Sequence, residues 1–528
     1  MGKITRYLNQ LIVGNVFDTP DILEAYSTDR SVLKIKPKYV ALPESTEDIR
    51  RLMRFCYQLA TKDMKVPITV RGAGSDEMGA DLGSGLVISM EKLNKLLESD
   101  RRERLVRVQA GITLKELNTA LSMHGLTVPI GGHQNETIGG LISNCPTDSY
   151  AGKYGGIMNY VEKIEVVLQN GDVLQTSRIS KSSLTRKMHE KTMEGGIYSK
   201  VAKVAEANKD LIENIRKNGV GSAGYPTIAQ AVRNKSIDLM PLFFGAEGTL
   251  GIISEVILRA VPIKSQTKRV VATFEDITMA QKFLDLVNDW KPRELNIYDL
   301  NIITSAKEAG KRLSAVTSKL ENGFVVYACF DDKANSALKK IEGLKSALPK
   351  STQLIVESRK NEITLNEFKN VLESFLNQTK DGERVPVLTN FYLPARNLAN
   401  FIEDMKVVEQ KMNLELDLYG SYSSSTYSLR PKFNPEDEDF NKKIITFLRT
   451  GAFIVNRQGG ALTGGAPEGR LKAAALDGEL GKGEEQMYLE IKGIFDRYDI
   501  LNPGVKLDVD LRYILRHFRT TSSAKIVI

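Results

Sequence analysis

Glycines recur at the ends of predicted strands between Val66 and Ile253. A glycine there lets the chain turn so tightly that successive backbone N–H groups point at one place, and such a concavity binds phosphate oxygens. One such turn is equally compatible with an ordinary strand–turn–strand connection, and neither the GxGxxG fingerprint nor the P-loop is matched. Several turns in one stretch favour a large phosphorylated cofactor held mostly by main chain. The segments are VPITVRGAGSDEMGA (66–80), VRVQAGITLKELNTAL (106–121), TIGGLISN (137–144), AGKYGGIMNYV (151–161) and FFGAEGTLGIIS (243–254).

Cysteine chemistry is disfavoured by the spacing of the thiols. The three cysteines, Cys56, Cys145 and Cys329, lie far apart and form no CxxC pair. Structural disulfides and a cysteine-ligated iron–sulfur centre are therefore not expected, and a reducing cytoplasm fits this usage best.

Length and charge limit the organisation of the chain. A chain of 528 residues is too long for one core, and roughly three domains is the simplest expectation. The net charge is +8, but Lys and Arg are interleaved with acids, which favours a solvated basic surface over a nucleic-acid-binding stripe. The chain has no apolar run of ~18 residues to predict a transmembrane helix, and the N-terminus lacks the apolar core of a secretory signal.

The elements that must position the glycine turns follow from pattern and caps. Residues 37–65 predict a strand, a turn and a helix, and Thr113 can cap a second helix. Residues 163–176 predict a hairpin. Residues 178–240 predict a charge-rich helical excursion, to which we assign no role.

After Pro262 the pattern changes to strands that alternate with helices. Four such pairs are predicted, and their strands begin at RVVATFED, GFVVYACFDD, TQLIVESR and VPVLTNFYLP. This alternation predicts a separate α+β unit, an antiparallel sheet covered by helices.

Taken in order, the segments resemble the flavin-binding domain of the vanillyl-alcohol oxidase / p-cresol methylhydroxylase superfamily, and within it the group that contains the flavin subunit of glycolate oxidase and the D-lactate dehydrogenases. The matching motifs are YSTDRSV, KPKYVALPESTEDIRRLM, RGAGS, VQAGITLKELN, TIGGLISN, KYGGIMNYV, FFGAEGTLGIISE and LNPG. The resemblance implies an α+β fold: a two-subdomain FAD-binding (PCMH-type) module with an α+β cap domain built on an antiparallel sheet. The implied domains are 1–262 for FAD with the excursion 178–240, 263–475 for the cap, and 476–528 for the C-terminal return and a basic tail helix.

The resemblance implies FAD as the cofactor and a place for it. In this superfamily a histidine of the pyrophosphate loop can carry the flavin covalently, but here Ser75 follows Gly74, and His133 is expected to be a neutral loop histidine. We therefore expect non-covalent FAD. The resemblance assigns the pyrophosphate to the first glycine loop, Arg71, Gly72, Ala73, Gly74, Ser75 and Asp76, and the flavin and its phosphates to Thr137, Gly139, Gly140 and Asn144. It assigns the adenosine–pyrophosphate wall to Gly152, Tyr154, Gly155 and Ile157. It assigns the adenine and ribose side to Glu247, Gly248, Gly251 and Ile253, and the isoalloxazine to Asn502.

The substrate side departs from the family pattern. The D-2-hydroxy acid dehydrogenases of this group usually show motifs resembling GHxGDGNxH and GEHGxG, whose imidazoles hold a divalent metal or take the substrate hydroxyl proton. Here the corresponding segments read LYGSYSSSTYSLRP and GGALTGGAPEGR. The four histidines, His124, His133, His189 and His517, fall in neither motif, so we expect no histidine-held metal.

Tyrosines and arginines occupy the segments that lack histidines. Oxidation of an alcohol needs a base for the hydroxyl proton, and a phenol with a pKa near ~10 serves only if a neighbouring cation lowers that pKa. Tyr427 beside Arg430 is one such pair, and an arginine is the best clamp for a substrate carboxylate. Solvated loop tyrosines and surface arginines are the alternative interpretation. The candidate catalytic residues are Tyr422, Tyr427, Arg396, Arg430 and Arg470, and the rebuilt segments also contain Tyr419 and Glu468.

The interpretation that fits best is an FAD-dependent oxidoreductase that oxidises a small hydroxyl-bearing substrate by hydride transfer to flavin N5. The substrate class expected from the resemblance is a D-2-hydroxy acid such as lactate or glycolate. Two alternatives stay open: an oxidase of a sugar or aromatic alcohol, and a flavin-binding electron-transfer subunit without substrate chemistry of its own. The electron acceptor, whether a quinone, a carrier protein or oxygen, is also open.

The C-terminal segment LRYILRHFR predicts an amphipathic helix with arginines on its polar side. Packing on the chain's own body is favoured, whereas docking on an anionic membrane or a partner subunit is the alternative. We therefore expect a cytoplasmic protein, with peripheral contact at the inner face of the membrane and a homo-oligomer as open options.

Overall fold

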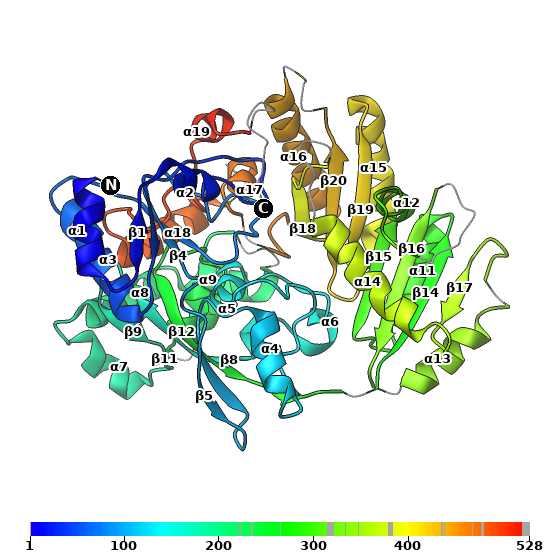
Figure 1. Ribbon diagram of the computed structural model, residues 1–528, viewed down its shortest axis with the longest axis horizontal. Helices are drawn as coiled ribbons and strands as arrows, with labels where there is room; N and C mark the ends of the chain where they lie inside the picture. Colours follow the sequence, from blue (N-terminus) through cyan, green and yellow to red (C-terminus); the bar gives the residue numbers. More distant parts are fainter. Residues whose placement is uncertain are drawn as a thin grey trace.

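The computed structural model describes residues 2–519 except for a few positions, and it arranges them in two lobes (Figure 1). One lobe holds the N-terminal half and the helices near the C-terminus, and the other holds a large sheet. The positions without a description are 1, 220, 222, 234–235, 265, 314–321, 333, 347, 378–383, 435–436, 438, 467, 477–479 and 520–528.

A four-stranded sheet precedes the first glycine turn. Its order is β1 (Asn15–Phe17), β2 (Tyr39–Leu42), β4 (Leu86–Ser89), β3 (Ile68–Arg71), and the last three strands are parallel. The helix α3 (Thr46–Ala60) connects β2 to β3, and the Ser45 side chain caps it by accepting from the Asp48 amide. Ligands bind outside the carboxyl ends of parallel strands, and the glycine turn leaves β3 at that end. The helices α1 (Lys3–Leu11) and α2 (Pro20–Ala25) complete this part.

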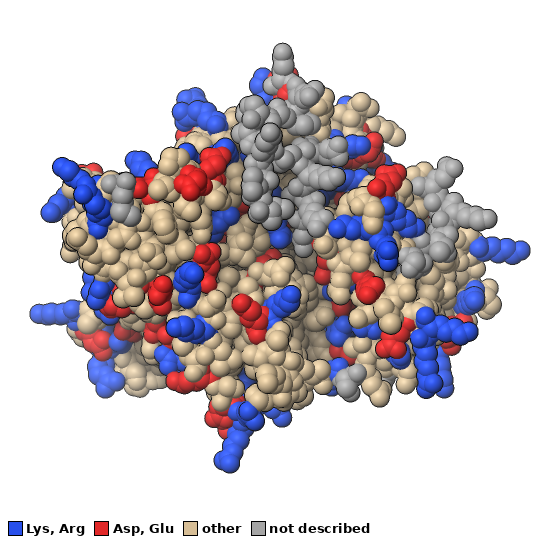
Figure 2. Space-filling view, in the orientation of Figure 1, with Lys and Arg blue, Asp and Glu red and all other residues tan. Residues whose placement is uncertain are grey.

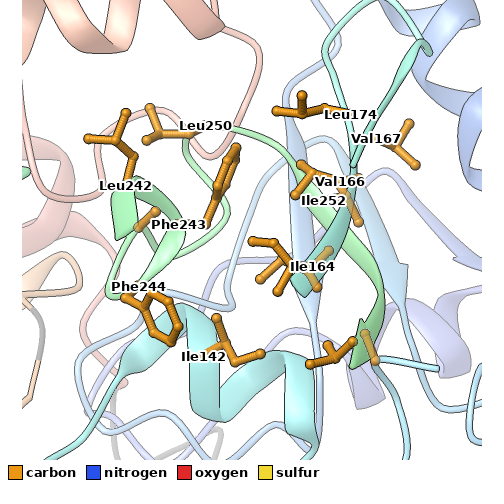
Figure 3. Close-up of a cluster of buried hydrophobic side chains, with 14 of the residues drawn as sticks. Ile142, Ile164, Val166, Val167, Leu174, Leu242, Phe243, Phe244, Leu250 and Ile252 are labelled. Atoms are coloured by element: carbon orange, nitrogen blue, oxygen red, sulfur yellow. The ribbon is translucent and has the colours of Figure 1, made fainter. Parts of the chain in front are cut away.

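A five-stranded antiparallel sheet forms the second part of the same lobe. Its order is β5 (Leu96–Asp100), β6 (Leu105–Gln109), β12 (Ile252–Arg259), β8 (Val161–Val167), β9 (Val173–Gln175). The helix α5 (Ile138–Asn144) packs on β12, and Ile142 joins Ile164, Phe243 and Ile252 in the apolar core that Figure 3 shows. This core fixes α5 and the turn before β12 next to the loop after β3. The helices α4 (Leu114–Ser122) and α6 (Ala151–Tyr154) lie beside this sheet.

The charge-rich excursion folds as helices that pack against the C-terminal return. The helix α8 contacts α18 (Lys482–Phe495), and the Tyr225 and Tyr488 rings meet edge to face at 6.1 Å. The excursion and the C-terminal return are therefore packed together in the first lobe. Its helices are α7 (Lys181–Met188), α8 (Met193–Ala207), α9 (Lys209–Asn218) and α10 (Ile228–Ala231).

The second lobe is an α+β cap built on an antiparallel sheet, as predicted. The described residues form seven strands in the order β17 (Leu354–Val356), β14 (Lys268–Phe274), β16 (Phe324–Phe330), β15 (Glu294–Asp299), β19 (Glu415–Ser421), β20 (Thr426–Lys432), β18 (Leu388–Tyr392). The strand β15 and helix α12 are an additional pair that the sequence pattern did not predict. The cap helices are α11 (Ile277–Asn288), α12 (Leu300–Glu308), α13 (Ala334–Gly343), α14 (Glu362–Asn377), α15 (Leu398–Met412) and α16 (Phe440–Arg457).

The two faces of the cap sheet differ in chemistry because successive side chains of a strand alternate between them. One face packs in the core formed with α11, α13, α15 and α16, and it includes Tyr427 and Leu429. The other face, covered in part by α12 and α14, carries Tyr419 and its register partner Ser428. Arg430 lies on this second face, with its guanidinium carbon 5.4 Å from the centre of the Tyr419 ring.

The C-terminal helix packs on the chain itself, which was the favoured expectation. Ile514 of α19 (Leu511–Arg516) and Phe518 are buried in the same core as the cap helices. Within the described ranges, no helix is both long and apolar enough to span a bilayer. On the face that Figure 2 shows, basic and acidic side chains are interspersed, in agreement with the interleaved charges of the sequence.

Candidate active site

A cavity lies where the loop after β3, the start of α5 and the turn before β12 meet. Most of the residues that the resemblance assigned to FAD line it. Those residues are Gly72, Ala73, Gly74, Ser75, Asp76, Thr137, Gly139, Gly140, Asn144, Glu247, Gly248, Gly251 and Ile253. The resemblance had not assigned the remaining lining residues to FAD, and they include Asp81, Glu136 and Ser143.

The glycines of this cavity are required by close packing. A Cβ on Gly72 would overlap the Thr137 hydroxyl, and a Cβ on Gly139 would lie 2.9 Å from the Ala110 Cβ. Gly74 adopts φ +69°, a conformation that L side chains rarely take. The cradle therefore exists only with these glycines, and its exposed main chain suits the phosphates of a dinucleotide such as FAD.

The charged residues that line the cavity are carboxylates, and none of the described lining residues is a lysine or arginine. Three of these carboxylates have a cation behind them. Glu247 pairs with Lys506 at 3.4 Å, Asp81 with Arg71 at 3.6 Å and Glu136 with His133 at 2.9 Å. Phosphates in this cavity must therefore be held by backbone amides and by the cations Lys506, Arg71 and His133, which lie behind the carboxylates.

His133 has a raised pKa, which favours the imidazolium over the neutral loop histidine that was expected. Burial alone would lower its pKa, but the adjacent Glu136 carboxylate raises the pKa of His133 to about 9. Because Glu136 lines the cavity, the imidazolium offsets a negative charge at its wall.

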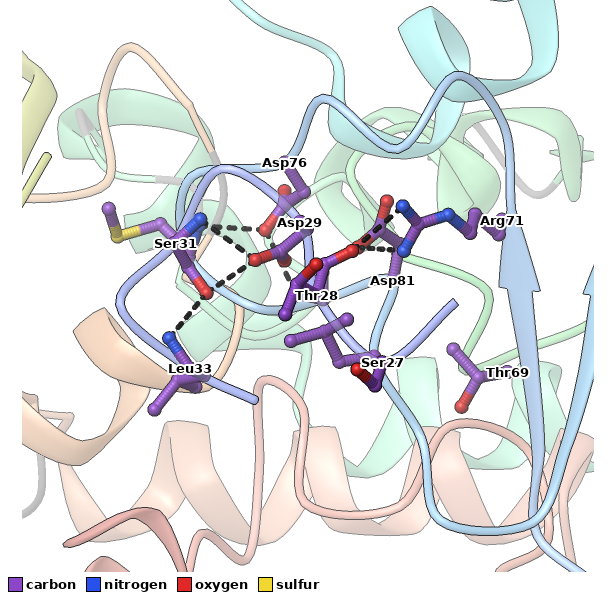
Figure 4. A network of polar contacts seen from close by, with 12 residues as sticks. Ser27, Thr28, Asp29, Ser31, Leu33, Thr69, Arg71, Asp76 and Asp81 are labelled. Atoms are coloured by element: carbon purple, nitrogen blue, oxygen red, sulfur yellow. Dashed lines mark hydrogen bonds and ion pairs between the residues drawn. The ribbon is translucent and has the colours of Figure 1, made fainter. Parts of the chain in front are cut away.

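Asp76 is the fourth carboxylate, and it lies next to the buried carboxylates of Asp29 and Asp81 (Figure 4). Its Oδ1 accepts from the amides of Met78 and Ala80 at 2.8 and 2.9 Å. Burial, and then the charge of Asp81, raise the pKa of Asp76 to about 6. The carboxyl is therefore close to half protonated in slightly acidic solution.

FAD binding is expected to weaken as the pH rises above about 6. A pyrophosphate in the predicted loop disfavours ionised Asp76, so binding above the raised pKa takes up a proton. The dissociation constant of FAD should rise by up to about tenfold per pH unit between pH 6 and 8 and stay flat below pH 6. Titration of the apoprotein with FAD, followed by flavin fluorescence, measures the dissociation constant at each pH. Asp76→Asn should remove the slope, whereas the exposed Asp172→Asn should keep it; equal slopes would contradict the prediction.

A buried ion network lies behind Glu247. Lys506 contacts both Glu247 and Glu468, and the Glu468 carboxylate accepts from the Gly224 amide at 2.6 Å. The Glu247 carboxylate accepts from the Gly469 amide at 2.8 Å. The network thus joins the cavity wall, the excursion and the C-terminal return. The sequence motifs had placed Glu468 on the substrate side and had not singled out Lys506.

Several predicted cofactor residues do not line the cavity. Gly152 and Tyr154 lie at the contact with the cap, where Gly152 faces Ser423 and the Tyr154 hydroxyl binds Asp331. Ile157 is buried in the apolar core, and Gly155 packs against Asn159. These four residues are thus not part of the cavity lining, and their assignment to the adenosine–pyrophosphate wall stays a prediction.

The other two outlying residues support the cavity from behind. Arg71 donates to the Thr28 carbonyl at 2.8 Å in addition to its ion pair with Asp81. Asn502 is buried and donates to the carbonyls of Ala80 and Glu247, at 2.7 and 2.8 Å. It therefore positions the wall of the cavity rather than lining it.

The predicted base Tyr427 lies on the face of the cap sheet opposite to that of Arg430. Tyr427 and Arg430 are three residues apart on β20 and therefore point to opposite faces. Burial raises the pKa of Tyr427 well above its usual value. The phenol beside Arg430 is that of Tyr419, and burial raises its pKa as well, more than the nearby guanidinium lowers it.

The remaining catalytic candidates have structural partners. The Tyr422 hydroxyl donates to Asp285 of α11 at 2.5 Å. Arg470 donates to the carbonyls of Pro503 and Leu82 at 2.8 and 2.9 Å. Arg396 is exposed on the outside of the cap.

Arg430 connects the cap to the first glycine loop. It donates to Glu77 at 2.6 Å and also binds the Leu376 carbonyl. Its role in this structure is thus to hold the cap against the FAD loop, so the clamp and base roles predicted for these arginines and tyrosines are not supported by their contacts.

The histidine positions of the family motifs carry small side chains. Counting along GHxGDGNxH places Ser421 and Ser428 at its two histidines, both on the polar face of the cap sheet. Counting along GEHGxG places Ala466 at the third. In the part of the chain that the structure describes, no three His, Cys, Asp or Glu residues are grouped so as to hold a metal.

Comparisons with known proteins agree with this architecture. Residues 37–177 match the family model described as the FAD binding domain, and residues 263–505 match that of the FAD linked oxidases, C-terminal domain. Among solved structures, p-cresol methylhydroxylase with substrate bound has a TM-score of 0.67 at 14% identity and covers 97% of both chains. Alkyldihydroxyacetonephosphate synthase has a TM-score of 0.63 at 18% identity and covers 94% of this chain and 84% of its own.

Curated relatives include proteins named as dehydrogenases or oxidases of hydroxy acids. Glycolate oxidase subunit GlcD of Bacillus subtilis is 25% identical over 90% of each chain, and D-lactate dehydrogenase of Archaeoglobus fulgidus is 24% identical over 91% of this chain and 95% of its own. D-2-hydroxyglutarate dehydrogenase of Pantoea ananatis is 24% identical over 90% of this chain, which spans 48% of that protein. With its two matched domains and its glycine cradle, the chain belongs to the FAD-linked oxidases of the vanillyl-alcohol oxidase / p-cresol methylhydroxylase superfamily, and its cofactor is FAD.

Proposed function

We propose that this protein oxidises a small 2-hydroxy acid by hydride transfer to non-covalently bound FAD, without a histidine-held metal. The observation that carries the proposal is a pair of cations at the contact between the cap and the residues that follow α5. Arg293 and Lys369 lie over the Tyr150 ring, 4.9 and 5.3 Å from its centre. The segment that holds Tyr150 follows closely after Ser143 and Asn144, which line the FAD cavity.

Lys369 is the candidate clamp for the substrate carboxylate. Its ammonium is buried and binds Glu294, which is buried, and Glu373 at 3.2 Å, whose side chain is 34% exposed. A substrate carboxylate can exchange with the more exposed Glu373 without leaving a buried charge unpaired. This clamp replaces the three arginines named from the sequence.

When bound, FAD supplies the hydride acceptor. The chain's own residues hold it through the glycine cradle and keep water from the site by closing the cap over it. Arg430 and Glu77 fix the cap to the cradle at 2.6 Å. The relatives named above, which are called dehydrogenases or oxidases of lactate, glycolate and 2-hydroxyglutarate, support a hydroxy acid as substrate.

One observation favours a second candidate, a flavin-binding electron-transfer subunit without substrate chemistry. Serine or alanine stands at each position where the family motifs carry histidine. A chain that had lost substrate turnover would retain the FAD cavity and the cap contacts.

We expect D-lactate, glycolate or D-2-hydroxyglutarate to bleach the flavin of the purified holoprotein under anaerobic conditions. Lys369→Met should raise the substrate concentration needed for half-maximal bleaching by about tenfold or more, because a charged hydrogen bond contributes about 1.5–3 kcal/mol. The exposed Lys360→Met is the matched control. Acid precipitation should release the flavin into the supernatant.

The alternatives predict different results in the same assay. If only sugars or aromatic alcohols bleach the flavin, the substrate is such an alcohol and not a hydroxy acid. If no alcohol bleaches the flavin, the result favours the electron-transfer subunit. Flavin that remains with the acid precipitate would contradict non-covalent binding. Reoxidation of the bleached protein by oxygen, a soluble quinone or a carrier protein identifies the acceptor.

A further inference from the structure

Residues 147–150 of the FAD lobe lie between the two segments where the family motifs carry histidines. The Thr147 amide donates to the Gly465 carbonyl at 2.7 Å, within the second motif. The Ser424 hydroxyl, from the turn of the first motif, donates to the Asp148 carbonyl at 2.8 Å. The main chain of this segment therefore joins both rebuilt motifs at one point.

The side chain at this point is a carboxylate with one unsatisfied oxygen. Asp148 is 2% exposed, and its Oδ1 accepts from the amides of Gly131 and Tyr150, both at 2.8 Å. Its Oδ2 is buried and has no hydrogen-bond partner among the residues that the structure describes. Leaving a buried acceptor unsatisfied costs about 1–3 kcal/mol, so such a group calls for a partner that the protein alone does not supply.

We propose that Asp148 is the base that accepts the substrate's hydroxyl proton, in place of the missing histidines. The inference rests on the proposed function, since it requires an alcohol substrate. Two amides fix Oδ1, so Oδ2 is held in one direction and is the oxygen that a hydroxyl can approach.

The surrounding charges suit a carboxylate base. Burial raises the pKa of Asp148, while the His133 imidazolium and the Lys369 ammonium lower it in part. Both cations are themselves paired, His133 with Glu136 and Lys369 with Glu294 and Glu373. Burial, and then the charge of Asp148, raise the pKa of the Cys145 thiol to about 12, so it stays neutral. The raised pKa makes the Asp148 carboxylate a stronger base than that of an exposed aspartate.

The proton and electron balance of the step is simple. The O–H bond of the substrate breaks, and its proton binds Asp148 Oδ2. The C–H bond breaks and its hydrogen leaves with both electrons to FAD, while the carbon and oxygen form a carbonyl. The proton on Asp148 later passes to solvent.

The test compares Asp148→Asn with the exposed control Asp289→Asn, both loaded with FAD. We expect Asp148→Asn to slow anaerobic flavin reduction by alcohol about 10²–10⁴-fold, the usual contribution of a general base. The wild-type rate should rise with pH as the carboxylate ionises, and the residual rate of Asp148→Asn should lack this rise. The dissociation constant of FAD and reduction by dithionite should match the wild type within about twofold, which shows that the cofactor site is intact.

Each outcome decides between the two proposals. A hydroxy acid that reduces wild type and Asp148→Asn at similar rates overturns the role of Asp148 and leaves the proposed function standing. Reduction by another alcohol alone, lost in Asp148→Asn, supports Asp148 and overturns the hydroxy acid. No reduction of the wild type by any alcohol overturns both. If Asp148→Asn fails to bind FAD, Asp148→Glu is measured instead, and an unchanged pH profile there overturns the proposal.

Discussion

Lys506→Met is expected to destabilise the FAD lobe by about 3–5 kcal/mol, the usual cost of removing one partner from a buried ion pair. The side chains of Lys506, Glu247 and Glu468 have exposed fractions of 0%, 0% and 1%. Burial opposes the charge of Lys506, but the carboxylates of Glu468 and Glu247 raise its pKa, so the lysine is a cation in the folded protein. Its loss leaves the buried side chains of Glu247 and Glu468 without their shared cation. The melting temperature should fall on the order of 10 °C.

A double variant separates charge from packing. Glu468→Gln combined with Lys506→Met removes one of the two facing charges and should recover part of the loss. The exposed Lys163→Met should change stability by no more than about 0.5 kcal/mol. Thermal unfolding by circular dichroism, with and without FAD, measures all three. Because Glu247 lines the cavity, FAD should also bind more weakly to Lys506→Met. An unchanged melting temperature of Lys506→Met would show that the ion pairs of Lys506 with Glu247 and Glu468 contribute nothing to stability.

Gly72→Ala is expected to weaken FAD binding about 10–100-fold while the rest of the fold stays intact. The added Cβ would overlap the hydroxyl of Thr137, which caps α5 by accepting from the Gly140 amide. Relief requires the loop or the start of α5 to shift, and overpacking of this kind costs about 1–3 kcal/mol. Since 1.4 kcal/mol is about tenfold in affinity, the loss is measurable by fluorescence titration.

A matched glycine variant controls for the substitution itself. Gly196 lies inside α8, and a Cβ there meets no heavy atom of the described residues within 4 Å. Gly196→Ala should leave FAD binding unchanged and stabilise the helix by up to about 1 kcal/mol. A Gly72→Ala protein that binds FAD as tightly as Gly196→Ala would show that the loop is not constrained by Thr137.

The cofactor half of the molecule could be predicted because its signals are local. A glycine turn after a strand, or a threonine that caps a helix, constrains the few residues around it, and these constraints hold wherever the chain folds. Gly72, Gly74, Thr137 and Gly248 accordingly line one cavity. The antiparallel cap sheet followed from strand–helix alternation in the same way.

The predicted pairing of Tyr427 with Arg430 was wrong, and the long-range contacts of the other substrate-side candidates were not predicted. Tyr427 and Arg430 are neighbours in the sequence, yet strand alternation places them on opposite faces, and Arg430 faces Tyr419 instead. That error was avoidable, since a predicted strand already implies the alternation. The pairing of Tyr422 with Asp285 of α11 could not have been predicted, because no local rule relates two residues so far apart.

The sequence by itself determined the fold class, the FAD cradle and the absence of histidines from both motifs. Only the tertiary structure decided which charged groups are buried together. Lys506 meets Glu468, 38 residues away, and Glu247, 259 residues away. Thr147 and Asp148 meet the two rebuilt motifs, which lie more than 250 residues further along the chain. The physical reason is that backbone conformation depends on neighbouring residues, whereas the burial and charge of a side chain depend on every segment that packs around it.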